Sequence, residues 1–170
     1  TGIFADHDGN HPQRERQLVL TMDDGWSGTT ELVGQILQQH QFPLMLYVTS
    51  YYADKQIPVL NVAVSYLLWK SRQNSLTLAL PGQPAINTAL PAAQPAELVR
   101  QICQQLDALP DVAQRSAALY DLADQLDVRL VHDGKALFRL LDPTELVTLQ
   151  RANVELQLHT HRHCSPLDST

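Results

Sequence analysis

The stretch VLTMDDGW, residues 19–26, decides the fold: an apolar run ends at two adjacent acids and a glycine. A short apolar run that stops at a glycine turn is typical of a buried strand, so residues 17–22 are predicted to be one. Two adjacent carboxylates repel each other unless a positive group or a proton separates them. Asp23 and Asp24 are therefore expected either in water at a turn or beside something that binds there.

The residues that follow predict a strand–helix–strand unit. Residues 28–41 place apolar side chains at helical spacing, and residues 44–48 form a second apolar run that predicts a strand. Two strands joined by a helix within about 30 residues are parallel in known folds. The predicted inner face of the helix consists of Leu32, Val33, Ile36 and Leu37.

The middle of the chain predicts further helices and a hairpin. Residues 58–71, which include Trp69, are predicted to be a buried helix, and residues 74–80 a strand. Four prolines and a glycine in residues 81–95 indicate a linker or surface loop. Helical patterns follow at residues 96–109 and 112–126, and Asp133-Gly134 between two apolar runs indicates a hairpin turn.

The end of the chain predicts one more helix and one more strand. Asp142, Pro143 and Glu145 form a helix start with a capping box, and the helix should run to about Ala152. Asn153 suits a left-handed C-cap. Residues 154–163 are predicted to be a strand in which three apolar residues alternate with polar ones, namely Val154, Leu156 and Leu158.

Two predicted strands thus end in residues that bind metals, the acids in one and a histidine-rich run, His159 to His163, in the other. The carboxyl ends of parallel strands share one edge, so these groups can meet although they lie far apart in sequence. Imidazole nitrogen with a carboxylate suits Zn²⁺ or its first-row neighbours. A bound dication would also offset the repulsion between the two acids.

Composition excludes several classes of partner. The chain has 170 residues, of which 44% are hydrophobic, so it is long enough for one globular domain with a proper core. The net charge is -6 and the basic residues are scattered, which argues against nucleic acid and anionic membranes as partners. No apolar run approaches the roughly 18 residues that span a bilayer. Cys103 and Cys164 are too few for a disulfide framework.

Both motifs resemble those of a known family. LTMDDG, residues 20–25, resembles the first motif of the polysaccharide deacetylases, the NodB-like domains of carbohydrate esterase family four, which usually reads TFDDG. HTHRH, residues 159–163, resembles their second motif, H-[ST]-x-x-H. The segments that lead into the two motifs are also similar to that family.

The resemblance implies a distorted (β/α) barrel and a role for each matched residue. Asp24, His159 and His163 match the metal ligands, and Asp23 matches the catalytic base. Thr160 matches the hydroxyl residue that supports the histidine loop. His161 stands at a variable position of the motif and is a candidate for an extra ligand. The implied metal is Zn²⁺, with Co²⁺, Ni²⁺ or Mn²⁺ as alternatives.

The implied activity is hydrolysis of N-acetyl groups on a carbohydrate, a C–N bond other than a peptide bond. Alternatives are another acyl or amide hydrolase on the same scaffold (a deformylase, an imidase or an O-deacetylase) and an inactive carbohydrate-binding relative. The sequence departs from the family pattern in two places. Residues 52–141 are expected to be an insertion between the motifs without a metal ligand. The family's later motifs, with the general acid, do not follow His163, so residues 1–170 are expected to be a partial domain, inactive alone.

Overall fold

The computed structural model describes residues 19–40, 42–152 and 154–161. The chain forms two compact units. Unit 1 contains the described residues up to Asp54 together with those from Leu141 onward, and unit 2 is Lys55–Leu140. Mixed helices and strands in the described residues agree with the predicted α/β class.

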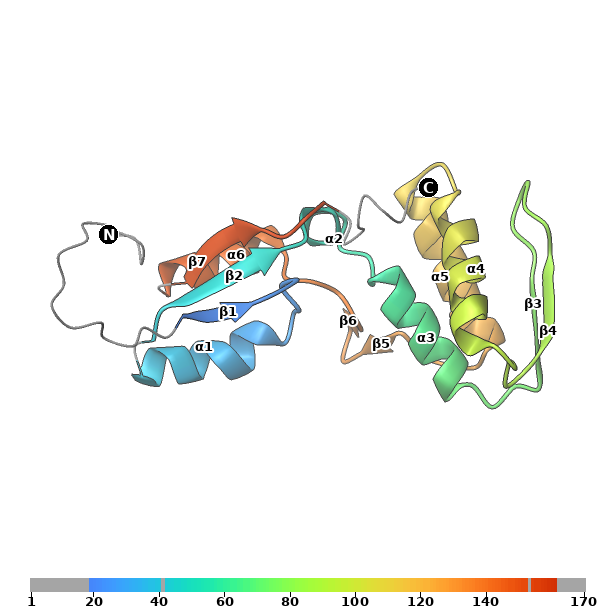
Figure 1. Ribbon diagram of the computed structural model, residues 1–170, viewed down its shortest axis with the longest axis horizontal. Helices are drawn as coiled ribbons and strands as arrows, with labels where there is room; N and C mark the ends of the chain where they lie inside the picture. The colour runs from blue at the N-terminus through green and yellow to red at the C-terminus, as the bar shows by residue number, and fades with distance from the viewer. Residues whose placement is uncertain (1–18, 41, 153, 162–170) are drawn as a thin grey trace, which may run out of the picture. The chain divides into compact units, whose positions relative to one another are not determined.

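Unit 1 is built on a three-stranded parallel sheet in the order β1-β2-β7 (Figure 1). The strands are β1 Leu20–Met22, β2 Leu44–Val48 and β7 Val154–Leu158. Leu20 pairs with Leu44, and Leu44 also pairs with Val154, so β2 lies in the centre of the sheet. The parallel pairing of β1 with β2 confirms the predicted strand–helix–strand unit.

The helices of unit 1 are α1 Thr29–His40, α2 Ser50–Lys55 and α6 Pro143–Arg151. Leu44, Leu46 and Val48 alternate along β2 and form one face of the sheet. This face shares a core with Leu37 of α1 and Leu149 of α6. α1 and α6 agree with the sequence-based expectation, whereas α2 was not predicted.

The predicted capping box at the start of α6 is confirmed. The Asp142 carboxylate accepts a hydrogen bond from the Glu145 backbone N–H at 2.8 Å, and the Glu145 carboxylate accepts one from the Asp142 N–H at 2.9 Å. These two bonds satisfy backbone donors that the first turn of a helix leaves without partners. The C-cap residue is Ala152, and Asn153 lies outside the described residues.

Several burial predictions for unit 1 were wrong. Val19 is 43% exposed and Leu20 half-buried, so the first strand is not a buried one. Leu158, one of the three apolar residues that alternate along β7, is 79% exposed, and Ile36 of α1 is 55% exposed. For the strand residues the reason is sheet order: among the described strands, β1 and β7 have a neighbour on one side only, whereas β2 has two. The last strand also ends at Leu158, earlier than predicted.

Unit 2 is a helical unit with two hairpins. Its helices are α3 Leu60–Lys70, α4 Pro95–Asp107 and α5 Val112–Gln125, all three of which were predicted. Their buried faces meet in one core, and its fully buried helix residues include Leu67, Ile102, Leu106, Leu119 and Leu122. The predicted burial of Trp69 was wrong, because it is 77% exposed. It follows buried Leu67 by two residues, about 200° around the helix, and so points away from the core.

The segment predicted as a proline-rich linker contains a strand. β3 Ser75–Leu78 pairs antiparallel with β4 Ile86–Ala89, and Gly82 takes a positive φ of 72° between them. Leu76 and Leu78 pack into the helical core, and their burial stabilises the hairpin despite the prolines.

The second hairpin agrees with its turn signal. β5 Val131–His132 pairs with β6 Lys135–Ala136. Asp133 and Gly134, at φ 49° and 76°, provide the two positive-φ residues that a type I′ turn needs. Within the described part of the chain, no helix is long and apolar enough to cross a membrane.

Candidate functional site

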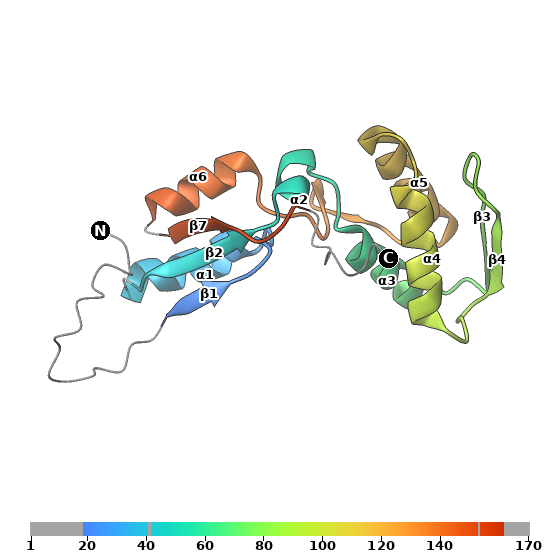
Figure 2. The same cartoon turned by 45° about the horizontal axis from the view of Figure 1, so that its top comes forward.

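The candidate site lies in unit 1, where the three parallel strands end. Figures 1 and 2 show the arrowheads of β1, β2 and β7 pointing the same way. Asp23 and Asp24 follow β1, and His159 follows β7. Because β2 pairs with both strands in parallel, the acids and the histidine come to one edge of the sheet.

Asp24 is held in a tight turn. Its φ is 69°, and the Gly25 N–H donates to the Asp23 carbonyl across it at 2.8 Å. A side chain at positive φ is strained, and such strain persists only where surrounding contacts impose it. Here the Asp24 carbonyl accepts from Thr49 N–H at 3.2 Å, and the Gly25 carbonyl accepts from Leu141 N–H at 2.7 Å.

The two acids have different surroundings. The Asp23 residue is exposed, whereas the Asp24 side chain is only 22% exposed. One Asp24 carboxylate oxygen, Oδ1, lies 3.5 Å from His159 Nε2. The two adjacent carboxylates are therefore not equivalent, and Asp24 is the one that faces the histidine.

His159 is positioned by β2. Its backbone N–H donates to the Val48 carbonyl at 2.9 Å, which extends the β2–β7 pairing by one residue. Its imidazole lies edge-on to the Tyr47 ring, with the ring centroids 6.4 Å apart. The His159 side chain keeps 32% of its surface exposed, so solutes can reach the ring.

The spacing of Asp24 and His159 fits a shared metal ion. Two ligand atoms at ~2.0–2.1 Å from one tetrahedral zinc lie roughly 3.4 Å apart. The observed separation of 3.5 Å between Oδ1 and Nε2 is close to this value. It is also long for a direct hydrogen bond. One carboxylate and one imidazole are donors that zinc and its neighbours accept.

The third predicted ligand, His163, lies outside the described residues. Within the described ranges, no group of three His, Cys, Asp or Glu side chains is arranged to hold a metal ion. The structure thus brings two of the three predicted ligands together.

His161 takes a different position from the one expected of a strand residue. The strand has ended at Leu158, and Thr160 has a φ of 120°, so His159 and His161 do not share a strand face. His161 Nδ1 lies 3.0 Å from Ser50 Oγ. Its ring packs edge-on to Tyr51, with centroids 5.5 Å apart.

The start of α2 supports the histidine loop. Ser50 N–H donates to the Thr160 carbonyl at 3.3 Å, and Tyr51 N–H donates to the His161 carbonyl at 2.9 Å. Sequence reasoning missed these supporting residues. The sequence does contain a signal for them: Thr49 and Ser50 directly follow the second strand. The other two strands carry their polar residues at the same position.

A small cavity of about 320 Å³ lies beside the ends of β2 and β7. It is lined mainly by apolar side chains, among them Val48, Leu146 and Leu158. Asp23, Asp24 and His159 do not line it, so it is not the space in front of the candidate ligands.

The sequence was compared with known families and proteins. It matches the family model described as Polysaccharide deacetylase over residues 10–169. The chain belongs to the polysaccharide deacetylase family. The match confirms the resemblance drawn from the two motifs. No curated protein and no solved structure matches the chain.

Membership of the polysaccharide deacetylase family supports a deacetylase-type function and a carbohydrate substrate. The match includes the whole of unit 2. The roles of the individual site residues, the metal and the status of residues 52–141 as an insertion stay predictions.

Proposed function

We propose that this chain belongs to a metal-dependent hydrolase that removes N-acetyl groups from a polysaccharide or oligosaccharide. The observation that supports it most directly is the 3.5 Å approach of Asp24 to His159 at a shared strand-end edge. Family membership supplies the class of reaction and of substrate. The net charge of -6 favours a neutral or amino-sugar glycan over an anionic one.

In this proposal Asp24 and His159 hold a divalent metal ion, most simply Zn²⁺, together with His163. The bound ion would supply Lewis acidity, which lowers the pKa of a water molecule and polarises the acetyl carbonyl. The strained turn at Asp24 serves to aim its carboxylate at His159 rather than into solvent. The Tyr47 ring contacts the imidazole, and the Val48 carbonyl holds the His159 backbone.

Asp23 acts as the general base. Its exposed position lets its carboxylate reach a water molecule that the neighbouring Asp24, turned toward His159, cannot reach. It accepts the proton of the water as the oxygen attacks the acetyl carbon. The C–N bond then breaks as the sugar nitrogen takes a proton from the general acid of the family's later motifs, which releases acetate and leaves an amine on the sugar.

Thr160 and His161 are assigned supporting roles. Their carbonyl groups accept hydrogen bonds from the start of α2, so the loop that carries His159 is tied to the end of β2. The same proposal treats the three-stranded sheet as part of a distorted (β/α) barrel, and residues 52–141 as an insertion that supplies no ligand.

The test is release of acetate from chitohexaose by the full-length protein. Activity should disappear with a chelator and return when Zn²⁺ is added. His159→Ala should lower both zinc content and acetate release, whereas His132→Ala is the matched control and should change neither. His132 is exposed and lies in the β5–β6 hairpin of unit 2. Full activity in metal-free protein would refute the metal-dependent mechanism.

A further inference from the structure

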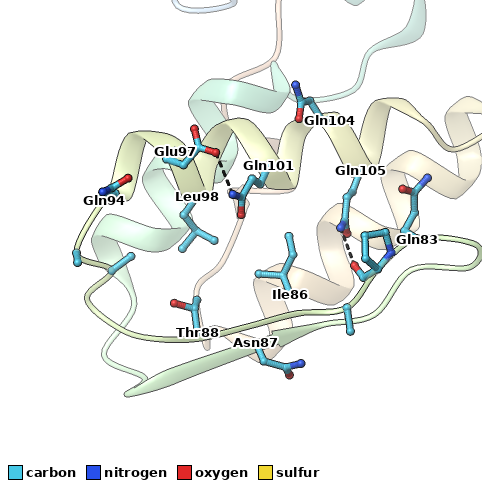
Figure 3. A pocket seen from close by; sticks show the side chains of 14 residues that line it. Gln83, Ile86, Asn87, Thr88, Gln94, Glu97, Leu98, Gln101, Gln104 and Gln105 are labelled. Atoms are coloured by element: carbon cyan, nitrogen blue, oxygen red, sulfur yellow. Dashed lines mark hydrogen bonds between the residues drawn. The ribbon is translucent and has the colours of Figure 1, made fainter.

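Unit 2 contains a cavity of about 750 Å³ that is lined by its own residues alone. One wall is α4, and the other is β4 with the turns on either side of it (Figure 3). Ligand pockets in proteins usually have volumes of roughly 300–1,000 Å³. This cavity is therefore large enough for a small organic ligand or one segment of a polymer.

The lining of this cavity is rich in side-chain amides. Leu98 and Ile86 provide an apolar centre between the two walls (Figure 3). Uncharged polar side chains surround it, among them Gln83, Thr88, Gln94, Gln101 and Gln105. A primary amide both donates and accepts hydrogen bonds, so these walls suit a ligand whose polar groups do the same.

Gln105 joins the two walls of the cavity. The residue is 8% exposed, and its Nε2 donates to the Pro84 carbonyl at 2.7 Å, a bond drawn in Figure 3. Its Oε1 is buried and has no hydrogen-bond partner among the described residues. Burying an acceptor without a partner is unfavourable, and the bond to Pro84 and the packing around Gln105 offset this cost.

The charge and the residue types of the lining argue against phosphates and nucleobases as ligands. None of the fourteen lining residues, all within the described ranges, is Lys, Arg, His or aromatic. The only charged residue is Glu97, and its carboxylate accepts hydrogen bonds from Arg100 and Gln101, which lower the pKa of Glu97. Phosphates would lack a cation in this lining, and nucleobases would lack a stacking partner.

We propose that this cavity is a second carbohydrate-binding site, which holds a neutral N-acetylated glycan without acting on it. Sugar hydroxyl and acetamido groups donate and accept as the amides do, and the C–H face of a pyranose can rest on Leu98 and Ile86. A peptide that added to β4 would be recognised through backbone groups and would not need amides on α4. The choice of an N-acetylated glycan rests on the proposed function.

The consequence is a gain in affinity for long substrates. A polymer held at one site is present at high effective concentration for another site of the same chain. The amide-lined cavity should therefore favour polymeric over short glycans without affecting the chemical step.

The experiment is a titration of the ¹⁵N-labelled full chain with chitohexaose, followed by NMR, in an Asp23→Asn background that slows turnover. Side-chain NH₂ signals of Gln101 and Gln105 should shift and saturate. Gln101→Ala and Thr88→Val should each weaken this binding by about 3–10-fold. The control Gln125→Ala replaces an exposed glutamine of α5 outside the cavity and should leave the affinity unchanged.

The outcomes separate this inference from the proposed function. Shifts confined to residues 22–26 and 159–161, or no shifts, would overturn the second site. So would a neutral octapeptide of serine and threonine that moved the same glutamine signals with higher affinity than chitohexaose. Acetate release is measured separately on the full-length protein with Asp23 intact. Glutamine shifts without acetate release would keep the second site and reject the deacetylase mechanism.

Discussion

The adjacent aspartates offer the sharpest test, because the two should separate metal binding from catalysis. Asp24→Ala removes the carboxylate that lies 3.5 Å from His159, and should therefore lower zinc affinity as well as activity. Asp23→Asn keeps the size of an exposed side chain and removes only its basic oxygen. It should keep the metal and lose activity.

The two effects on zinc affinity differ enough in size to be told apart. Loss of a partner that only orients a ligand already costs 10–100-fold in metal affinity, so loss of the ligand Asp24 should cost at least about 100-fold. A unit charge about 6 Å from a dication in water contributes about 1.4 kcal/mol, or roughly tenfold. Because Asp23 is exposed, water and salt screen its charge, and roughly tenfold is the upper limit for Asp23→Asn.

The assay pairs a zinc titration against a chromophoric chelator with acetate release from chitohexaose. Asp23→Asn should lower the rate by about 10²–10⁴-fold, the usual contribution of a positioned general base. If Asp23→Asn loses zinc while Asp24→Ala keeps it, the two roles are reversed. If Asp23→Asn retains full activity, the base lies elsewhere and the mechanism proposed here is wrong.

Further predictions concern strain, capping, ligand assignment and thiol reactivity. Asp24→Gly should be more stable than Asp24→Ala by about 1 kcal/mol in urea unfolding, because glycine relieves the strain at φ 69°. Part of the gain is lost, because glycine also increases the entropy of the unfolded chain. Equal unfolding midpoints of the two variants would contradict the strain. Asp142→Ala removes the α6 cap and should lower the free energy of unfolding by about 1 kcal/mol in the same assay. An unchanged free energy of unfolding would show that this cap does not form in solution. His132→Ala should leave zinc content unchanged, and loss of zinc would show that unit 2 supplies a ligand. Burial, with the nearby Asp107 charge, raises the pKa of the Cys103 thiol to about 12 from 9.0, so at pH 8 its thiolate fraction should be about 1,000-fold lower than usual. In a Cys164→Ser background, iodoacetamide should therefore label native protein far more slowly than urea-unfolded protein, and equal rates would refute the burial.

Features that depend on neighbours in sequence were predicted correctly. The capping box of Asp142 and Glu145, the Asp133-Gly134 hairpin turn and most helices belong to this group. Each is decided by a few adjacent residues, through side-chain bonds to the backbone or positive φ. The meeting of Asp24 with His159 was also expected, because parallel strands put their carboxyl ends at one edge.

The tertiary structure alone decided which apolar residues are covered and what supports the site. Leu158 looks like a core residue from its alternation, yet it is 79% exposed because β7 has one neighbouring strand among those described. Ile86 sits in a proline-rich segment, yet it belongs to a strand that pairs with β3 and lines a cavity against α4. The contact of His161 with Ser50 depends on a short helix that has no strong sequence signal. Burial and support come from residues far away in the chain, and local periodicity carries no information about those partners.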